Sequence, residues 1–237
     1  METNLITHDV VAAGTMRFRF TKPAGFTYQA GQSIDLTLID PPETDAEGTS
    51  RAFSLASSPD DDHLAITTRM RDTAFKRTLK SMASGTPMQL EGPFGELTLP
   101  QRADRPIVFL AGGIGITPFY SMVRYATART LPHRITLFYS NRRPEDAAFL
   151  DELLALPSAN PNFAFIPTMT GMVHSSVAWN GERGYIDAAM LKRHLDSAEN
   201  PIYYLAGPLS MVTALRAMLN ESGIADNDIR IEEFAGY

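Results

Sequence analysis

The chain has 237 residues, an apolar fraction of 44%, a formal net charge of −6 and no cysteine, and this composition is typical of a soluble globular protein with one large domain or two small ones. The lack of cysteine excludes disulfides, thiolate zinc sites, an internal iron–sulfur cluster and a catalytic thiol. The negative charge argues against nucleic acid as the main partner, and no apolar run approaches the roughly 20 residues that a membrane span requires.

The first ten residues are polar and show no signal peptide. We therefore expect a cytoplasmic protein. The five histidines are scattered, and no two stand four residues apart, so we expect no histidine metal site.

The first part of the chain has the pattern of short β-strands. Apolar residues alternate with arginines at 15–20 and with polar residues at 34–38. Turn residues separate these runs, and this spacing predicts a small antiparallel β-barrel. One helix is predicted at 73–82, with Thr73 or Asp72 as its N-cap.

Beyond a connector at 100–106, the pattern changes to alternating strands and helices. This order predicts a doubly wound parallel sheet with helices on both faces. The predicted strands are 107–111, 134–139, 163–169, 201–206 and 229–234, and the predicted helices are 118–128, 144–156, 187–195 and 210–219. We therefore place a β-barrel domain at 1–103 and an α/β domain at 104–237.

Three glycines follow the first strand of the α/β half, in Ala111-Gly112-Gly113-Ile114-Gly115-Ile116-Thr117-Pro118. Glycine lets a phosphate approach the backbone, and the start of the next helix offers free N–H groups to an anion. Pro118 suits the first helical position. The spacing G-x-G-x-x-P departs from the dinucleotide fingerprint G-x-G-x-x-G, so a turn with a purely geometric role is the alternative. Gly207-Pro208 also ends a predicted strand, so one ligand could touch both segments.

A short strand carries Arg51-Ala52-Phe53-Ser54. Alternation places Arg51 and Phe53 on one side and Ser54 on the other. A flavin nucleotide needs a cation for its phosphates, a flat apolar surface for its rings and a hydroxyl near its reactive nitrogen. An ordinary strand with one exposed arginine is the alternative.

Together these segments resemble the ferredoxin–NADP reductase superfamily. Arg51-Ala52-Phe53-Ser54 resembles its R-x-[YF]-S motif, and residues 111–118 resemble its nicotinamide-nucleotide loop. Tyr204-Leu205-Ala206-Gly207-Pro208 is similar to its C/A-G-P segment, and residues 231–237 resemble the end of bacterial flavin reductase modules. The motifs occur in family order along nearly the whole chain, which indicates a reductase module without an iron–sulfur domain.

The resemblance implies an FAD site in the β-barrel. Arg51 would pair with the pyrophosphate, Phe53 would pack on the isoalloxazine, and Ser54 would form a hydrogen bond near flavin N5. Thr67-Thr68-Arg69 matches the strand beside the flavin. Thr73-Ala74-Phe75-Lys76 matches the second phosphate-binding turn, usually G-x-x-S, with lysine in place of the serine. A solvated helix face is the alternative for Lys76.

The resemblance also implies a pyridine-nucleotide site in the α/β domain. The expected contacts are Gly112, Gly113, Ile114, Gly115, Thr117, Pro118, Ala206, Gly207 and Pro208. Ser140, Arg142 and Arg143 follow the second strand of this domain, where the family reads the adenosine ribose. Two arginines could clamp a 2′-phosphate and favour NADPH, whereas acidic residues just beyond them leave NADH possible.

The expected catalytic residues are Ser54, Thr117, Phe234 and Tyr237. Phe234 or Tyr237 would cover the flavin until nicotinamide displaces it. As alternatives, Phe234 is a core residue of the last strand and Tyr237 is a disordered end. Ala206 stands where many family members have cysteine, so a thiol has no role.

The implied function is an FAD-dependent oxidoreductase that takes hydride from NAD(P)H and passes electrons singly to a separate carrier, such as ferredoxin, flavodoxin or an oxygenase component. The alternative is a flavin-bearing subunit of a larger complex without NAD(P)H oxidation of its own. A basic cluster could attract an acidic carrier, because opposite charges steer encounter. This cluster consists of Arg69, Arg71, Lys76, Arg77 and Lys80.

Overall fold

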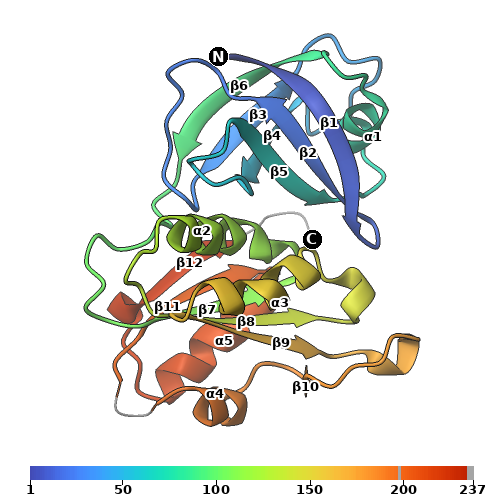
Figure 1. Cartoon of the computed structure of the whole chain (residues 1–237). Coiled ribbons are helices and arrows are strands. Elements are labelled where there is room, and N and C mark those ends of the chain that lie inside the picture. The colour runs from blue at the N-terminus through green and yellow to red at the C-terminus, as the bar shows by residue number, and fades with distance from the viewer. Residues whose placement is uncertain (197–198, 234–237) are drawn as a thin grey trace.

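The structure, a computed structural model, describes residues 1–196 and 199–233. Figure 1 shows a β-barrel stacked on an α/β unit, with helix α2 (Ile116–Ala128) between them. The predicted boundary after residue 103 lies in the connection between β6 (Pro87–Phe94) and β7 (Ile107–Gly112). The exact boundary stays a prediction. None of the helices in the described residues is long and apolar enough to cross a bilayer.

Six antiparallel strands form the barrel, in the order β4-β3-β6-β1-β2-β5. Their bounds are β1 (Glu2–Ala12), β2 (Thr15–Thr21), β3 (Ser33–Leu38), β4 (Ser50–Ser54), β5 (His63–Arg69) and β6 as above. A single antiparallel bridge between Leu55 and Ile66 joins the two edges of the sheet. Phe18, Phe20 and Leu36 are fully buried, because every second side chain of a strand shares one face.

Helix α1 (Ala74–Ser81) follows β5 and packs against the barrel core through Phe75 and Leu79. Its first turn is capped by Thr73, whose hydroxyl accepts a hydrogen bond from the backbone N–H of Lys76 at 3.3 Å. A threonine cap satisfies one of the N–H groups that a helix start leaves unpaired. The predicted position and cap of this helix are therefore confirmed.

The second sheet has six parallel strands in the order β10-β9-β8-β7-β11-β12. The strands beyond β7 are β8 (Ile135–Asn141), β9 (Phe163–Met169), β10 (Glu182–Arg183), β11 (Ile202–Gly207) and β12 (Ile229–Glu233). Helices α2 and α3 (Leu150–Ala159) cover one face, and α4 (Ala188–His194) and α5 (Leu209–Glu221) cover the other. The doubly wound sheet is confirmed, and every residue of β7 is buried because both faces are covered.

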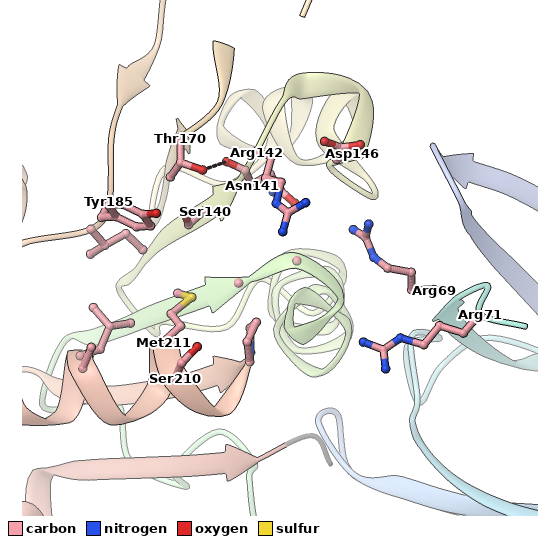
Figure 2. Close-up of a pocket in the computed structure, with 16 residues that line it drawn as sticks. Arg69, Arg71, Ser140, Asn141, Arg142, Asp146, Thr170, Tyr185, Ser210 and Met211 are labelled. Atoms are coloured by element: carbon pink, nitrogen blue, oxygen red, sulfur yellow. Dashed lines mark hydrogen bonds between the residues drawn. The ribbon is translucent and has the colours of Figure 1, made fainter. Parts of the chain in front are cut away.

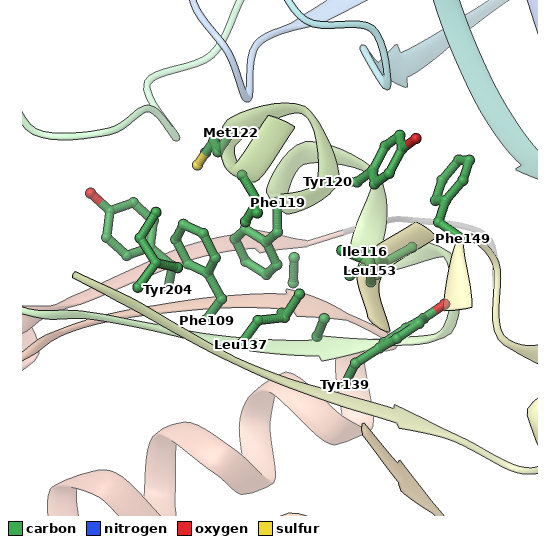
Figure 3. Packing of buried hydrophobic residues seen from close by; sticks show 14 of the residues in the cluster. Phe109, Ile116, Phe119, Tyr120, Met122, Leu137, Tyr139, Phe149, Leu153 and Tyr204 are labelled. Atoms are coloured by element: carbon green, nitrogen blue, oxygen red, sulfur yellow. The ribbon is translucent and has the colours of Figure 1, made fainter. Parts of the chain in front are cut away.

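Aromatic rings fill the core between the sheet and α2 (Figure 3). Phe109 stacks on Phe119 with ring centroids 4.4 Å apart, and Tyr204 meets Phe109 edge-on at 5.3 Å. Ala56 and Ala65 of the barrel belong to the same buried cluster. Helix α2 is therefore packed between the sheet and the barrel, with apolar contacts on both sides.

The predicted start of α2 is wrong by two residues. A 3-10 turn at Gly113–Gly115 comes first, and the helix begins at Ile116, so Pro118 is its third residue and not its first. The first N–H groups of a helix have no partner within it, so proline is still tolerated at this position.

The predicted start of α3 is also wrong. Residues 144–146 form only a 3-10 turn, and the helix begins at Leu150. Phe149, just before it, has a left-handed backbone with φ of 61°. Its ring stacks on Tyr120 of α2 with centroids 3.9 Å apart, so tertiary packing interrupts the helical path that the local pattern favours.

Candidate active site

The glycine-rich loop at the end of β7 lies against the end of β11. A Cβ on Gly115 would stand 2.3 Å from the carbonyl oxygen of Ala206, and a Cβ on Gly112 would stand 2.2 Å from Sδ of Met211. At Gly115, where the obstacle is backbone, only glycine therefore permits this close approach. Gly113 differs, because its φ is +53° and its Cβ position has no heavy atom within 4 Å. The loop thus has open space at the Cβ position of Gly113 and close contacts at those of Gly112 and Gly115.

Thr117 is buried in the first turn of α2, with 2% of its surface exposed. Its hydroxyl donates a hydrogen bond to the carbonyl oxygen of Ile114 at 2.8 Å. The bond ties the helix to the loop and leaves the oxygen lone pairs free to accept another. Contacts of Thr117, Ile114 and the buried Pro118 with a nucleotide stay predictions.

A cavity of about 700 Å³ opens beside this loop, at the carboxyl edge of the sheet (Figure 2). Its lining includes Gly112, Gly113, Ser140, Arg142 and Pro208. Ser140 lies directly opposite Gly112 in the β7–β8 pair. The volume lies within the range of about 300–1,000 Å³ that is typical of cofactor and ligand sites.

Arginine dominates the charge of this cavity. Arg69 and Arg71 reach it from the end of β5 in the barrel, and Arg142 from the end of β8. Within the part of the chain that the structure describes, none of these three forms an ion pair. Arg143 instead donates two hydrogen bonds to Asp146, of 2.7 and 2.9 Å, and these bonds hold the pKa of that carboxyl below its usual value. Three unpaired cations make the cavity suited to an anion.

Ser54 and Glu232 meet where the barrel faces the α/β sheet. The Ser54 hydroxyl donates to Oε1 of Glu232 at 3.4 Å, and Glu232 lies on β12 opposite Ala206 of β11. Burial raises the pKa of Glu232 to about 7, and the hydrogen bond from Ser54 lowers it only in part. A carboxyl that titrates near neutrality can hold or release a proton during a reaction.

Two buried oxygen atoms near this meeting point lack a hydrogen-bond partner among the described residues. They are Oε2 of Glu232 and Oγ1 of Thr67. Thr67 shares a face of β5 with Ala65, which packs toward the α/β domain. Because buried polar atoms are normally satisfied, these two oxygens fit a polar group bound beside them.

Arg51 and the start of α1 converge on one carboxylate. Arg51 lies over the ring of Phe75 and donates to Oδ1 of Asp45 at 3.2 Å, while the N–H of Ala74 donates to Oδ2 at 3.1 Å. Burial alone would raise the pKa of Asp45, but hydrogen bonds from the N–H groups of Glu47 and Ala74 and from Arg51 hold it below its usual value. An arginine and a helix start that share one anion are suited to a diphosphate.

The side chains of Phe53 and Lys76 are less accessible to a ligand than their predicted roles in FAD binding require. The Phe53 ring belongs to the barrel core and is 9% exposed. The Nζ of Lys76 donates to the carbonyl oxygen of Arg69 at 2.8 Å. Burial, together with the charges of Arg71 and Arg51, lowers the pKa of Lys76. Contacts of these two side chains with FAD stay predictions.

Comparisons with known proteins agree with this geometry. Residues 109–217 match the family model described as an oxidoreductase NAD-binding domain. The chain is 29% identical over 218 residues to ferredoxin--NADP reductase B from Sorangium cellulosum (strain So ce56), covering 88% of this chain and 86% of that protein. Its fold is similar to the crystal structure of a ferredoxin NADP+ reductase from Neisseria gonorrhoeae with bound FAD and NADP, with a TM-score of 0.82, 23% identity and 98% coverage of both chains. The chain is therefore similar to ferredoxin reductase-type FAD/NAD(P)-binding oxidoreductases in sequence and in fold.

Other relatives are longer than this chain. The reductase component of a phenol 2-monooxygenase from Pseudomonas sp. (strain CF600) is 30% identical over 214 residues, which cover 87% of this chain and 58% of that protein. The reductase component of a propane 2-monooxygenase from Rhodococcus jostii (strain RHA1) is 27% identical over 235 residues, which cover 97% of this chain and 60% of that protein. The chain thus spans less than two thirds of the length of these oxygenase components.

The structure brings both glycine segments, Ser140 and Arg142 around one cavity and places Ser54 at the domain interface. Glu232 has no role predicted from sequence, although it lies in the segment that resembles flavin reductases. Its burial follows from the pairing of β12 with β11, which no local pattern reveals. The predicted catalytic residues Phe234 and Tyr237 lie outside the described residues.

Proposed function

We propose that the chain transfers hydride from NAD(P)H to bound FAD and passes the electrons to a separate one-electron carrier. The observation that carries the proposal is the meeting of Ser54, on the barrel, with Glu232, on the sheet that also holds the glycine loop. The arginine-lined cavity opens at the same sheet edge. The two nucleotides can therefore approach one another at the domain interface.

The chain's own residues supply binding, orientation and a proton site. Arg51 and the N–H of Ala74 would hold the FAD phosphates, and Ser54 would offer its hydroxyl to the flavin. FAD bound there would accept a hydride and release its electrons one at a time. Glu232, with a pKa of about 7, would hold a proton beside Ser54. The glycines at 112–115 would let the coenzyme approach the backbone closely.

We further propose that NADPH is the preferred coenzyme. Arg142 lines the cavity beside Ser140 and has no ion pair among the described residues. Its guanidinium would pair with the 2′-phosphate, which NADH lacks. Arg143 is bound to Asp146, so the expected clamp of two arginines reduces to one.

The carrier is proposed from the relatives, which are a ferredoxin reductase and reductase components of oxygenases. The predicted basic cluster gives this proposal little support. Arg77 is paired with Glu43 and Asp72, and three other members face the cavity or the backbone. Arg71 and Lys80 are the exposed cations of the cluster that show no ion pair in the described residues, and Arg71 lines the cavity.

An absorbance spectrum followed by rapid mixing tests the proposed function. We expect the purified protein, with FAD supplied if needed, to show a flavin band that NADPH bleaches faster than NADH. Bleaching by neither coenzyme would favour a flavin-bearing subunit without NAD(P)H oxidation. A colourless protein that does not take up FAD would contradict both functions.

A further inference from the structure

Helix α2 carries the glycine loop at its start and is hydrogen-bonded to the barrel one turn later. The Ser121 hydroxyl donates to the carbonyl oxygen of Ser57 at 2.5 Å. Both residues are essentially inaccessible, with 0% and 1% of their surfaces exposed. A hydrogen bond sealed from water in this way does not exchange readily with solvent and keeps a fixed geometry.

The barrel side of this bond is itself held from two directions. The hydroxyl of Tyr28 lies 2.7 Å from the Ser57 hydroxyl and donates to the Ser57 carbonyl oxygen at 3.0 Å. The Ser57 hydroxyl also accepts from the N–H of Ala65 on β5 at 3.0 Å. Ser121 therefore attaches α2 to a barrel loop that is itself hydrogen-bonded to Tyr28 and to β5.

The hydrogen bond between Ser121 and Ser57 lies close in sequence to both parts of the predicted reaction site. Ser57 follows Ser54 by three residues, and Ser121 follows Thr117 by four. Residues four apart share one face of a helix and are about 6 Å apart along its axis. This buried hydrogen bond thus helps to set the spacing between the Ser54 hydroxyl, predicted to face the flavin, and the turn at Thr117, predicted to face the nicotinamide.

A charged pair repeats the attachment one turn further along α2. Arg124 donates to both oxygens of Asp61 at 2.7 and 3.1 Å, in the same barrel loop as Ser57. The Asp61 side chain is 17% exposed and that of Arg124 34%. At the end of the helix, Arg129 pairs with Asp60, but its side chain is 57% exposed. Burial therefore decreases with distance from the glycine loop.

We propose that Ser121 and Arg124 are positioning residues that hold the nicotinamide loop at a fixed distance from the flavin-side strand. The inference rests on the proposed function. Transfer between two bound groups requires their reacting atoms to be aligned, and a displacement of about 1 Å can cost roughly a hundredfold in rate. These two side chains touch neither nucleotide in this proposal. They act through Ser57 and Asp61.

The experiment compares Ser121→Ala and Arg124→Gln with Arg129→Gln as the matched control on the same helix. Rapid mixing with NADPH measures the flavin-reduction rate, its deuterium isotope effect and the coenzyme Kd. We expect the reduction rate to fall about tenfold in Ser121→Ala and less in Arg124→Gln, with the Kd unchanged within about twofold. The control Arg129→Gln should have the flavin-reduction rate and the coenzyme Kd of the wild type. A double variant Asp61→Asn/Arg124→Gln should be no slower than either single variant.

Hydrogen exchange gives a second readout that needs no turnover. Loss of the buried bond should speed amide exchange in residues 113–117 and 55–58 of Ser121→Ala, and leave the barrel strands β1 and β2 unchanged. Unchanged exchange, or a flavin-reduction rate within about twofold of the wild type, would overturn the inference. A fall in rate that matches an equal loss of coenzyme or FAD affinity would overturn it as well. If the wild type is not reduced by either coenzyme, the proposed function fails, and the exchange result still decides whether Ser121 couples the loop to the barrel.

Discussion

Ser54 of the barrel donates a hydrogen bond to Glu232 of the last strand at 3.4 Å, although 178 positions separate them in the chain. The contact joins the R-x-[YF]-S segment to the strand beside Ala206. A carboxyl is thereby half-buried at the domain interface, and its buried Oε2 has no partner among the described residues. Such an arrangement costs stability when the carboxyl is ionised.

The first prediction concerns pH. Burial raises the pKa of Glu232 from 4.5 to about 7 in the folded protein. The folded state therefore binds the proton more tightly than the unfolded state, so the stabilisation is complete below about pH 4.5 and is lost as the pH rises through about 7. Urea unfolding across this range should show the loss, at about 1.4 kcal/mol per unit of pKa shift. Glu232→Gln should remove this pH dependence of the free energy of unfolding, whereas Glu221→Gln, at the exposed end of α5, should leave it unchanged. An unchanged pH profile in Glu232→Gln would contradict the assignment.

The second prediction concerns Asp45, whose carboxylate binds the donors that we assign to the FAD phosphates. Asp45→Asn removes a charge that competes with the phosphates, so FAD should bind about tenfold more tightly, a gain of roughly 1.4 kcal/mol. Titration of the FAD-free protein followed by flavin fluorescence measures the change. Asp40→Asn, in the same loop and without a hydrogen bond in the described residues, is the control. Weaker FAD binding by Asp45→Asn would instead show that Asp45 holds Arg51 in its binding position.

The third prediction separates two neighbouring arginines. Arg142→Gln should weaken NADPH binding by about 1.5–3 kcal/mol and leave NADH binding nearly unchanged, because a charge-assisted bond to the 2′-phosphate is lost. Arg143→Gln should alter the NADPH to NADH ratio little, because Asp146 already holds that guanidinium. Titration of each variant with both coenzymes measures the ratio. The assignment fails if the two variants lose discrimination equally.

The sequence predicts the parts of this molecule that depend on local pattern. Alternation identifies the strands, and Thr73 identifies the start of α1, because these signals lie within a few residues. Sequence does not reveal that Arg143 is paired while Arg142 is not, because that difference depends on how the chain turns after β8. The start of α3 is missed for a related reason, since the stacking of Phe149 on Tyr120 outweighs helix propensity. The contact of Glu232 with Ser54 cannot be predicted from local sequence, because it depends on the pairing of β12 with β11 and on the packing of the barrel against the sheet.

The last prediction concerns Gly115, where the loop touches β11. The Cβ of an alanine would stand 2.3 Å from the carbonyl oxygen of Ala206, and neither backbone can give way without moving a strand end. We expect Gly115→Ala to lower the free energy of unfolding by about 1–3 kcal/mol and to weaken coenzyme binding about tenfold or more. Urea unfolding and coenzyme titration measure the two effects. Gly223→Ala, at a left-handed turn in open space, should cost about 1 kcal/mol of stability and leave coenzyme binding unchanged. Normal coenzyme binding by Gly115→Ala would show that the close contact between the two strand ends is not needed for the site.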